Sequence, residues 1–273
     1  MGKIPCTVGV LTFNSGKTLR RALESVKDFD ETILCDGGST DDTLSIAREY
    51  GAKVIQQDSA FQNDKGALID YAGVRNQCLD AARFDWFFYI DSDEVAMPEL
   101  VAEIADIART EKPKYLVYNI SPRIVLDGRL IEHSSNYPGW QKRFFNRTSN
   151  ARFRKAIHER IGYDSERYAA GYMKGHWNYF ITAADDRKKW EKYILMDVAL
   201  YQTKKLSEVL VFVWKKLITV LKTIFKSLYS YLRYPYHTCM PISIEYRRVL
   251  YQATVVYVLF LAYLGRPLTS IYD

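Results

Sequence analysis

The sequence has few cysteines, and none of them stand close together. The four are Cys6, Cys35, Cys78 and Cys239, and they form no CxxC pair. This spacing argues against a zinc site and a disulfide framework, and it makes a reducing compartment the default expectation. The first residues also lack the apolar stretch of a secretory signal peptide, so we expect no such peptide.

Internal repeats and low-complexity linkers are also lacking, and the composition does not indicate wholesale disorder. Of the 273 residues, 48% are hydrophobic and 26% are charged. The chain is therefore long and apolar enough to bury a sizeable core, either as one large domain or as a domain with an appendage. Tyrosine is abundant, with 21 copies, which suits carbohydrate-binding or interface surfaces as well as an ordinary core.

Short β-branched runs alternate with helical patterns in the first half of the chain. We expect strands over residues 7–13, 31–35, 52–56, 86–90 and 115–119, and helices over residues 18–26, 41–50, 70–82 and 97–110. This alternation predicts βαβ units in an α/β fold, with a mostly parallel sheet flanked by helices. Residues 123–179 have a less regular pattern, and residues 183–202 predict a polar helix.

Polar side chains follow three of the expected strands at the points where those strands end. Asn14 follows the first strand, Asp36 follows the second, and the acidic run 91–94 follows the fourth. Ligands of parallel α/β sheets bind beyond the carboxyl ends of the strands. The sequence therefore predicts a single site at this edge.

The run FYIDSDEV, residues 88–95, places Asp91, Asp93 and Glu94 within four positions. Like charges crowd in this way only where water, basic side chains or a cation offset their repulsion. Asp91 and Asp93 form a DxD pattern, and Mg²⁺ and Mn²⁺ favour carboxylate oxygens in sites shared with substrate phosphates. The alternative is a solvated acidic turn. Glu94 either caps the following helix or holds an arginine.

Two further residues have two interpretations each. Asp36, in CDGGSTDDT, either accepts hydrogen bonds from the ribose or base of a nucleotide or closes an Asx-turn before the next helix. Arg75 either faces the same cleft, where it pairs with phosphate, or lies on the surface.

Four motifs in order, VGVLTFN, CDGGSTDDT, RNQCLDAA and WFFYIDSDE, resemble those of the GT-A fold (Rossmann-like) glycosyltransferases of family 2. The usual second motif there is DDGSTDDT and the usual fourth is LDADE. The present sequence departs from them at Cys35, Gly37 and Ser92, and no departure removes Asp36, Asp91 or Asp93. The later motifs QKRFFNR, KAIHERI and GHWNYF are similar to those of the WaaE/KdtX-like lipopolysaccharide core transferases. The resemblance covers roughly residues 7–200.

The resemblance implies a donor site and a metal site. The nucleoside of a nucleotide-sugar donor, most readily a UDP-sugar, would lie against Thr12, Asn14 and Asp36, with Arg75 at its diphosphate. Asp91 would lie at the ribose and at a divalent cation, Mn²⁺ or Mg²⁺, with Asp93 as the more direct ligand. His176 would be a third ligand or a phosphate contact.

The resemblance also implies the chemistry. Enzymes of this family invert the anomeric centre by direct displacement, and they need one general base for the acceptor hydroxyl. Glu159 is the candidate base, and His158 would orient the acceptor or the phosphates. Arg143 either binds phosphate or bridges a loop to the sheet.

The last part of the chain is basic. Residues 203–250 contain nine Lys or Arg and two acids, and apolar residues recur at helical spacing over 206–232 with lysines opposite. Such a helix either packs on its own domain or lies on an anionic membrane leaflet, and we favour the second. The apolar stretch 249–264 is short for a span, which needs ~20 residues. We therefore expect peripheral attachment to the cytoplasmic face of the cell membrane.

These observations predict a GT-A domain over residues 1–202, with a nucleotide-binding part over about 1–120 and an acceptor part over about 121–202, and a basic amphipathic helical appendage over 203–273. The expected activity is inverting, metal-dependent sugar transfer to a glycolipid or lipid-linked saccharide in lipopolysaccharide or other cell-envelope glycan synthesis. The alternatives are a polyprenyl-phosphate glycosyltransferase, a nucleotidyltransferase and a catalytically silent binding protein. Nucleic acid binding is not expected, because the basic residues alternate with a continuous apolar face.

Overall fold

The computed structural model describes residues 2–63, 68–156, 159–182, 194 and 205–263. The chain divides into two compact units, one formed by Met1–Arg123 with Pro138–Tyr179 and the other by Ile124–Tyr137 with Phe180–Asp273. The helix expected over residues 183–202 lies outside the described residues except for Ile194, and so does the expected domain boundary after residue 202. That boundary stays a prediction.

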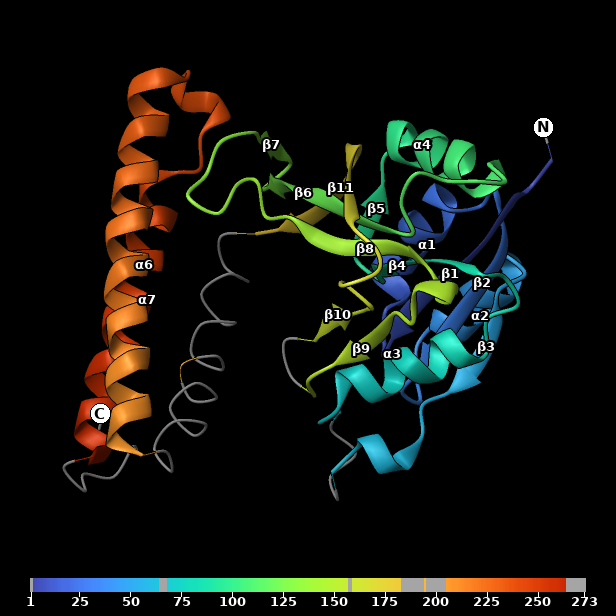
Figure 1. The fold of residues 1–273 in the computed structure, drawn as a ribbon, viewed down its shortest axis with the longest axis horizontal. Helices are drawn as coiled ribbons and strands as arrows, with labels where there is room; N and C mark the ends of the chain where they lie inside the picture. The colour runs from blue at the N-terminus through green and yellow to red at the C-terminus, as the bar shows by residue number, and fades with distance from the viewer. Residues whose placement is uncertain (1, 64–67, 157–158, 183–193, 195–204, 264–273) are drawn as a thin grey trace. The chain divides into compact units, whose positions relative to one another are not determined.

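The first half of the main sheet is parallel. Its strands are β1 (Ile4–Thr12), β2 (Phe29–Asp36), β3 (Lys53–Gln56) and β4 (Trp86–Asp91), in the order β3-β2-β1-β4. The helices α1 (Gly16–Ser25), α2 (Thr43–Glu49) and α3 (Tyr71–Asp80) lie between them in the sequence, and the single turn η1 (Ser59–Phe61) precedes α3 (Figure 1). Each of these strands and helices was expected from the sequence, within a few residues at its ends.

The second half of the sheet is antiparallel. It continues from β4 through β8 (Gln141–Asn146), β6 (Val117–Leu126), β11 (Ala170–Ile181) and β5 (Glu94–Ala96), and β7 (Arg129–Ile131) pairs with the far end of β6. A separate ribbon joins β9 (Arg152–Arg154) to β10 (Arg160–Gly162), and η2 (Arg147–Ser149) precedes it. The α/β fold class is confirmed, and the sheet is mixed because the irregular region of the sequence adds antiparallel strands.

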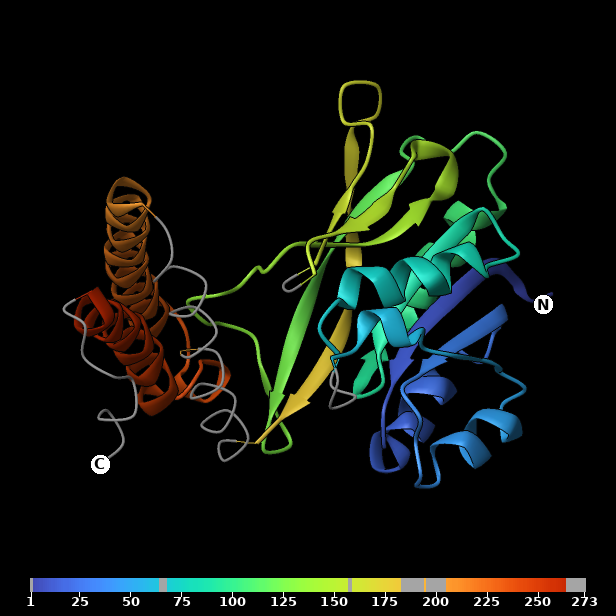
Figure 2. The same cartoon turned by 90° about the horizontal axis from the view of Figure 1, so that it is seen from below.

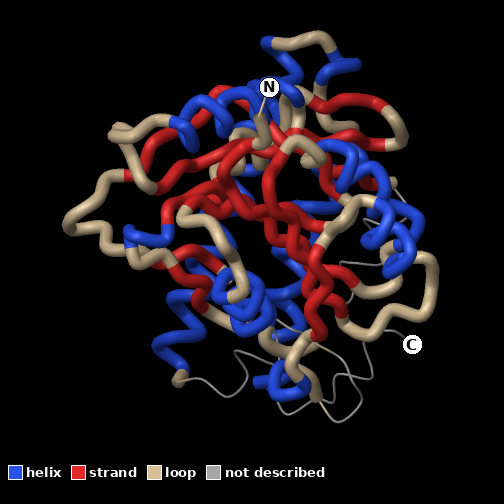
Figure 3. The backbone as a smooth tube through the Cα atoms, turned by 90° about the vertical axis from the view of Figure 1, so that its right-hand side faces the viewer, coloured by secondary structure: helices blue, strands red, loops and turns tan. Residues whose placement is uncertain are grey.

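The sheet of the first unit has a covered face on each side, so that strands lie between helices (Figure 3). On one face, Val8 and Val10 pack with residues of α1, α2 and α4 (Pro98–Arg109). On the other, Phe87 and Tyr89 pack with residues of α3 and with Phe153 of β9. Burial on both faces explains why these strands are apolar runs in the sequence.

Strand β11 lies very close to α4. A Cβ atom added at Gly175 would lie 2.4 Å from the Cα of Leu100, and one added at Gly171 would lie 2.6 Å from the ring of Tyr115. Gly171, Met173, Gly175 and Trp177 are therefore the inward side of a strand whose burial alternates from residue to residue.

The second unit is built around two long helices, α6 (Leu206–Arg233) and α7 (Ile242–Tyr263), which lie side by side in Figures 1 and 2. The short turn η3 (Tyr236–Thr238) lies between them. Val209 of α6 and Val255, Val258 and Leu259 of α7 form the buried apolar cluster of this pair. Within the described residues, no helix combines the length and the apolarity that a membrane crossing requires.

Candidate active site

The carboxyl ends of β2, β1 and β4 meet at one edge of the sheet. The strand register places Thr12 beside Asp36 and Leu11 beside Asp91, because β1 lies between the other two strands. The polar residues that follow these strands thus converge, as the sequence predicted.

Asp36 is buried, with 1% of its surface exposed. Its carboxylate accepts hydrogen bonds from the N–H groups of Gly38 and Ser39, at 2.9 and 2.8 Å. It also accepts from the hydroxyls of Ser39 and Thr12, at 2.6 and 2.9 Å. These hydrogen bonds form the Asx-turn that was one of the two interpretations of Asp36, and they hold the loop after β2 in place. Direct donor contacts of Thr12 and Asp36 stay predictions.

Asn14 joins the loops that follow β1 and β2. Its backbone φ is 49°, in the left-handed region that asparagine tolerates, and its side-chain Oδ1 accepts the N–H of Thr40 at 2.8 Å. Its own N–H donates to Ser39 Oγ at 2.8 Å. The position of Asn14 at the edge is as predicted, and the contacts that the structure gives it hold the two loops together.

Phe13 lies between Thr12 and Asn14, and 64% of its surface is exposed. A large aromatic ring in water at the carboxyl edge of a parallel sheet offers a flat apolar surface for a planar ligand group. Phe13 could not be singled out from the sequence, because it has the pattern of the last residue of an apolar strand. Its exposure could be found only from the place where β1 ends.

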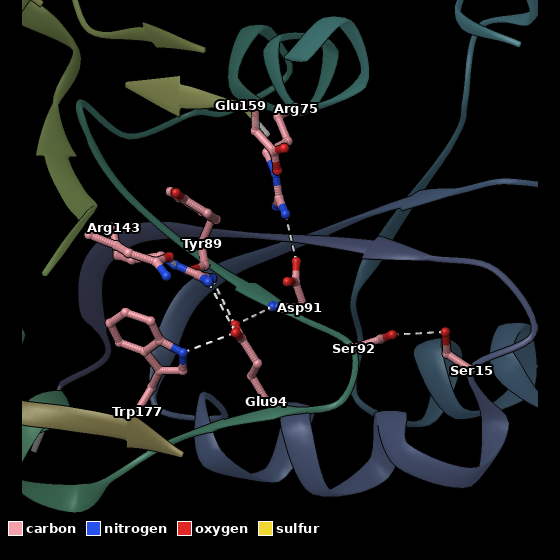
Figure 4. Close-up of polar contacts among 10 residues, drawn as sticks. Ser15, Arg75, Tyr89, Asp91, Ser92, Glu94, Arg143, Glu159 and Trp177 are labelled. Atoms are coloured by element: carbon pink, nitrogen blue, oxygen red, sulfur yellow. Dashed lines mark hydrogen bonds and ion pairs between the residues drawn. The ribbon is translucent and has the colours of Figure 1, made fainter. Parts of the chain in front are cut away.

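Arg75 joins two carboxylates that come from distant parts of the chain. Its Nη2 lies 2.6 Å from Oδ1 of Asp91 and its Nε lies 2.7 Å from Oε1 of Glu159 (Figure 4). Arg75 is on α3, Asp91 is the last residue of β4, and Glu159 directly precedes β10. Three separately predicted site residues are thus brought together.

Arg75 is 5% exposed, and its guanidinium carbon lies 4.6 Å from the ring centre of Tyr89. Burial opposes its charged form, but the carboxylates of Asp91 and Glu159 outweigh that effect, and the pKa of Arg75 is raised. Its Nη1 is buried and has no hydrogen-bond partner among the residues that the structure describes. A buried cationic N–H group without a partner is costly, so this atom is suited to an anionic oxygen of a ligand.

Glu94 and Arg143 form a second buried ion pair at the same edge. Arg143 Nη1 and Nη2 lie 2.7 and 3.0 Å from the two oxygens of Glu94. Glu94 also accepts the N–H of Asp91 at 2.8 Å and the indole N–H of Trp177 at 2.9 Å (Figure 4). The guanidinium lies between the rings of Tyr89 and Trp177, at 4.6 and 4.5 Å.

This pair decides between the alternatives left open for both residues. Glu94 holds an arginine. The guanidinium of Arg143 forms a buried ion pair with Glu94, and this pairing does not support the alternative that Arg143 binds phosphate. Burial raises the pKa of Glu94, although Arg143 favours its charged form. Through the N–H of Asp91, Glu94 holds the backbone at the start of the DxD turn.

The remaining part of the DxD turn lies near the first loop. Ser92 Oγ is 2.9 Å from Ser15 Oγ, which joins the turn to the beginning of α1. Asp93 is half-buried, and its carbonyl accepts from Arg21 Nη2 at 3.3 Å. The side chain of Asp91 is 40% exposed.

Of the two predicted histidines, only His176 is described, and the structure gives its ring no contact with the site carboxylates. His176 is in β11, where its Nδ1 lies 3.0 Å from the carbonyl oxygen of Ser121, and burial lowers its pKa although that carbonyl opposes the effect. His158 lies outside the described residues. Among the residues that are described, no three His, Cys, Asp or Glu side chains gather as metal ligands would. A metal role for His176 stays a prediction without geometric support.

The donor set nevertheless fits a hard cation that shares its site with a substrate. Asp91 and Asp93 supply carboxylate oxygens at the end of a strand, and such a cation commonly takes few protein ligands, with substrate phosphates and water completing its shell. A cavity of about 830 Å³ lies elsewhere, near the beginning of β1 and between α1 and α4. Because it is lined by Ile4 rather than by the residues at the other end of β1, it is not this site.

The family of the chain follows from comparison with known proteins. The model of the family described as Glycosyl transferase family 2 matches residues 7–178, which include every site residue described above. The chain belongs to glycosyl transferase family 2. The GT-A fold expected from the resemblance is thereby confirmed, whereas the WaaE/KdtX-like branch is a finer assignment that stays a proposal.

Several curated proteins are similar to this family 2 chain. The SPbeta prophage-derived glycosyltransferase SunS of Bacillus subtilis (strain 168) is 29% identical over 154 residues, which cover 56% of the chain and 34% of that protein. An uncharacterized glycosyltransferase of Rickettsia felis is 36% identical over 113 residues, which cover 41% and 37%. The chain thus spans little more than a third of the length of these relatives.

Two solved structures were also matched. Glucosyl-3-phosphoglycerate synthase from Mycobacterium tuberculosis, in complex with Mn²⁺, uridine diphosphate and glucosyl-3-phosphoglycerate, is 24% identical with a TM-score of 0.33, covering 43% of this chain and 44% of that one. S. aureus TarS 1-349 is 15% identical with a TM-score of 0.47, covering 97% and 92%. Neither likeness bears on the role of a residue in this chain.

Proposed function

We propose that the chain transfers a sugar, with inversion, from a nucleotide-sugar donor to a glycolipid or lipid-linked saccharide in cell-envelope glycan synthesis. Membership of family 2 supports the reaction class. The observation that carries the proposal is the contact of one buried arginine, Arg75, with both Asp91 and Glu159. A donor-side carboxylate and the candidate base are thus joined at the edge where ligands of such sheets bind.

Glu159 is the proposed general base. Its side chain is 17% exposed and is held by Arg75, so the carboxylate has a fixed place near the strand ends. A direct displacement at the anomeric carbon needs one group that takes the proton of the attacking hydroxyl, and a positioned carboxylate serves that purpose. Arg75 positions this base, and its Nη1, which no described residue contacts through a hydrogen bond, is suited to a phosphate oxygen of the donor.

Asp91 and Asp93 are the proposed ligands of Mg²⁺ or Mn²⁺. When bound, such a cation offsets the negative charge that grows on the departing nucleoside diphosphate. Glu94 and Arg143 keep the turn between the two aspartates in place, because Glu94 accepts the backbone N–H of Asp91. A UDP-sugar is the proposed donor, on the strength of the sequence resemblance.

A thermal-shift panel of UDP-, GDP- and dTDP-sugars, each with and without Mn²⁺, tests the donor site. The matching donor is expected to raise Tm by mass action. Asp93→Ala should abolish the metal-dependent part of the shift, and Asp30→Ala, an exposed change at the opposite end of β2, should not. If no nucleotide sugar shifts Tm at any metal concentration, the proposal fails and a silent binding protein is favoured.

The acceptor class needs a separate assay. Radiolabelled sugar is offered with lipid-linked saccharide in one reaction and with polyprenyl phosphate in another, using the donor found in the panel. Product on the lipid-linked saccharide is the expected result. Transfer to polyprenyl phosphate alone would replace the proposed acceptor and leave the donor site intact.

A further inference from the structure

Helix α6 carries its large apolar side chains on the outside. Over 28 residues its buried side chains are Val209, Thr223, Ser227 and Ser230, of which three are small and polar. The exposed ones include an apolar stripe at intervals of three and four residues, which consists of Leu210, Trp214, Leu217, Leu221, Phe225 and Leu228. Side chains at this spacing share one face of a helix.

The stripe is not the surface by which α6 contacts α7. That contact is made on the side of Val209, which clusters with Val255, Val258 and Leu259. Leu221 and Phe225, in contrast, are 68% and 72% exposed. Contiguous apolar surface of this extent marks an interaction site, because leaving it in water is unfavourable.

Positive charge accompanies the stripe on α6. Lys215, Lys222 and Lys226 are exposed, and they lie together on the side of the helix between the edge of the stripe at Phe225 and the buried side of Val209. Across α6 the only acid is Glu208, in its first turn. An apolar face bordered by lysines and containing an exposed tryptophan is the composition of a helix that lies in a membrane interface.

We propose that the apolar stripe of α6 binds the surface of an anionic lipid bilayer, with the helix lying along the interface and its lysines at the lipid headgroups. Charge complementarity favours lipid over a second copy of the chain, because two such faces would bring like charges together. It also favours lipid over nucleic acid, since the stripe is continuous and apolar. The inference concerns residues of α6 to which the proposed function gives no role, and it stands apart from that function.

Flotation of the full chain with vesicles tests this surface. The chain should float with vesicles of equal parts phosphatidylcholine and phosphatidylglycerol and much less with pure phosphatidylcholine. Leu221→Glu with Phe225→Glu should lower the partition coefficient at least tenfold, whereas Leu130→Glu, a change of the same kind at an exposed residue of β7, should leave it unchanged. Lys222→Glu should lower binding to the anionic vesicles alone, by about fivefold or more, since one lysine near the surface contributes about 1 kcal/mol.

Trp214 supplies an independent readout. Its emission should shift to the blue when anionic vesicles are added, and the shift should be absent from Trp214→Phe. Because the stripe residues are exposed, matching circular dichroism spectra and Tm values should show that the variants remain folded.

Three results would overturn the proposal. One is that the full chain does not float with anionic vesicles. Another is that Leu130→Glu lowers binding as much as the stripe variant does. The third is a dimer in sedimentation that becomes a monomer in the stripe variant without any vesicle binding, which would assign the stripe to self-association.

Discussion

The Nε atom of Arg75 lies 2.7 Å from Oε1 of Glu159, although 84 positions separate the two residues in the sequence. The same guanidinium reaches Asp91 at the end of β4. The position of the candidate base, Glu159, thus depends on α3, which carries Arg75, and on β4, which carries Asp91. Both elements come much earlier in the sequence than Glu159.

Glu159→Gln should lower kcat about 10²- to 10⁴-fold, because the amide cannot take the proton of the acceptor hydroxyl. Donor affinity should stay unchanged, since the proposed donor contacts lie on other residues. Initial rates of transfer and calorimetric donor binding measure the two effects separately. Glu159→Asp is the matched variant: it keeps a carboxylate, withdraws it from Arg75, and should give an intermediate rate. A rate for Glu159→Gln within tenfold of the unaltered chain would remove Glu159 from the role of base.

Glu94→Gln should lower the free energy of unfolding by about 3–5 kcal/mol, because it leaves the buried Arg143 charge without its partner. Urea unfolding measures the change. Glu49→Gln is the control, since it breaks an Arg–Glu pair that lies exposed on the surface, and it should leave the stability essentially unaltered. Equal effects of the two substitutions would mean that the Glu94–Arg143 pair contributes no more than a surface pair.

Phe13→Ala should weaken donor binding by about 1–3 kcal/mol if the exposed ring stacks on the nucleobase, which is the range measured for base–aromatic stacking. Phe13→Trp should preserve affinity. Tyr172→Ala serves as the control, because Tyr172 is equally exposed, at 65%, and packs on Trp140 away from this edge. Unchanged donor affinity in Phe13→Ala would exclude the stacking contact.

The lowered pKa of His176 makes stability depend on pH. Burial, its main cause, favours the neutral ring in the folded chain, so the unfolded chain binds more protons in acid. The contribution of His176 should be fully present above its unfolded pKa of about 6.5 and be lost as pH falls through the lower, folded value. His176→Asn should therefore flatten the pH dependence of the urea midpoint on the acid side. An unchanged acid-side dependence in His176→Asn would contradict this expectation.

The parallel half of the fold could be predicted from the sequence, because its strands are apolar runs separated by amphipathic helices. Of the antiparallel half, only the beginning of β6 could be predicted, and β11 illustrates why the rest could not. Its inward residues include Gly171 and Gly175, which have no side chain, so the alternation of burial leaves little trace in the pattern of hydrophobicity.

The site residues divide in a similar way. Asp91, Arg75 and Glu159 could be named because each stands in a recognisable motif, but their shared contact depends on how α3 approaches β4. The sequence indicated that Glu94 could hold an arginine, but it did not indicate which one, because 49 positions separate Glu94 from Arg143. Pairing over such separations is decided by the packing of the sheet.

Gly175 also has a consequence for how this chain can vary. With the Cα of Leu100 only 2.4 Å from where a first side-chain atom would be placed, even alanine at position 175 would force α4 away from the sheet. A library covering every substitution should therefore tolerate fewer replacements there than at the half-exposed Asp91, although Gly175 contributes no charge, no hydrogen bond from a side chain and no contact with a ligand. Loss of function at that position would report a collision between backbones rather than a damaged reaction centre.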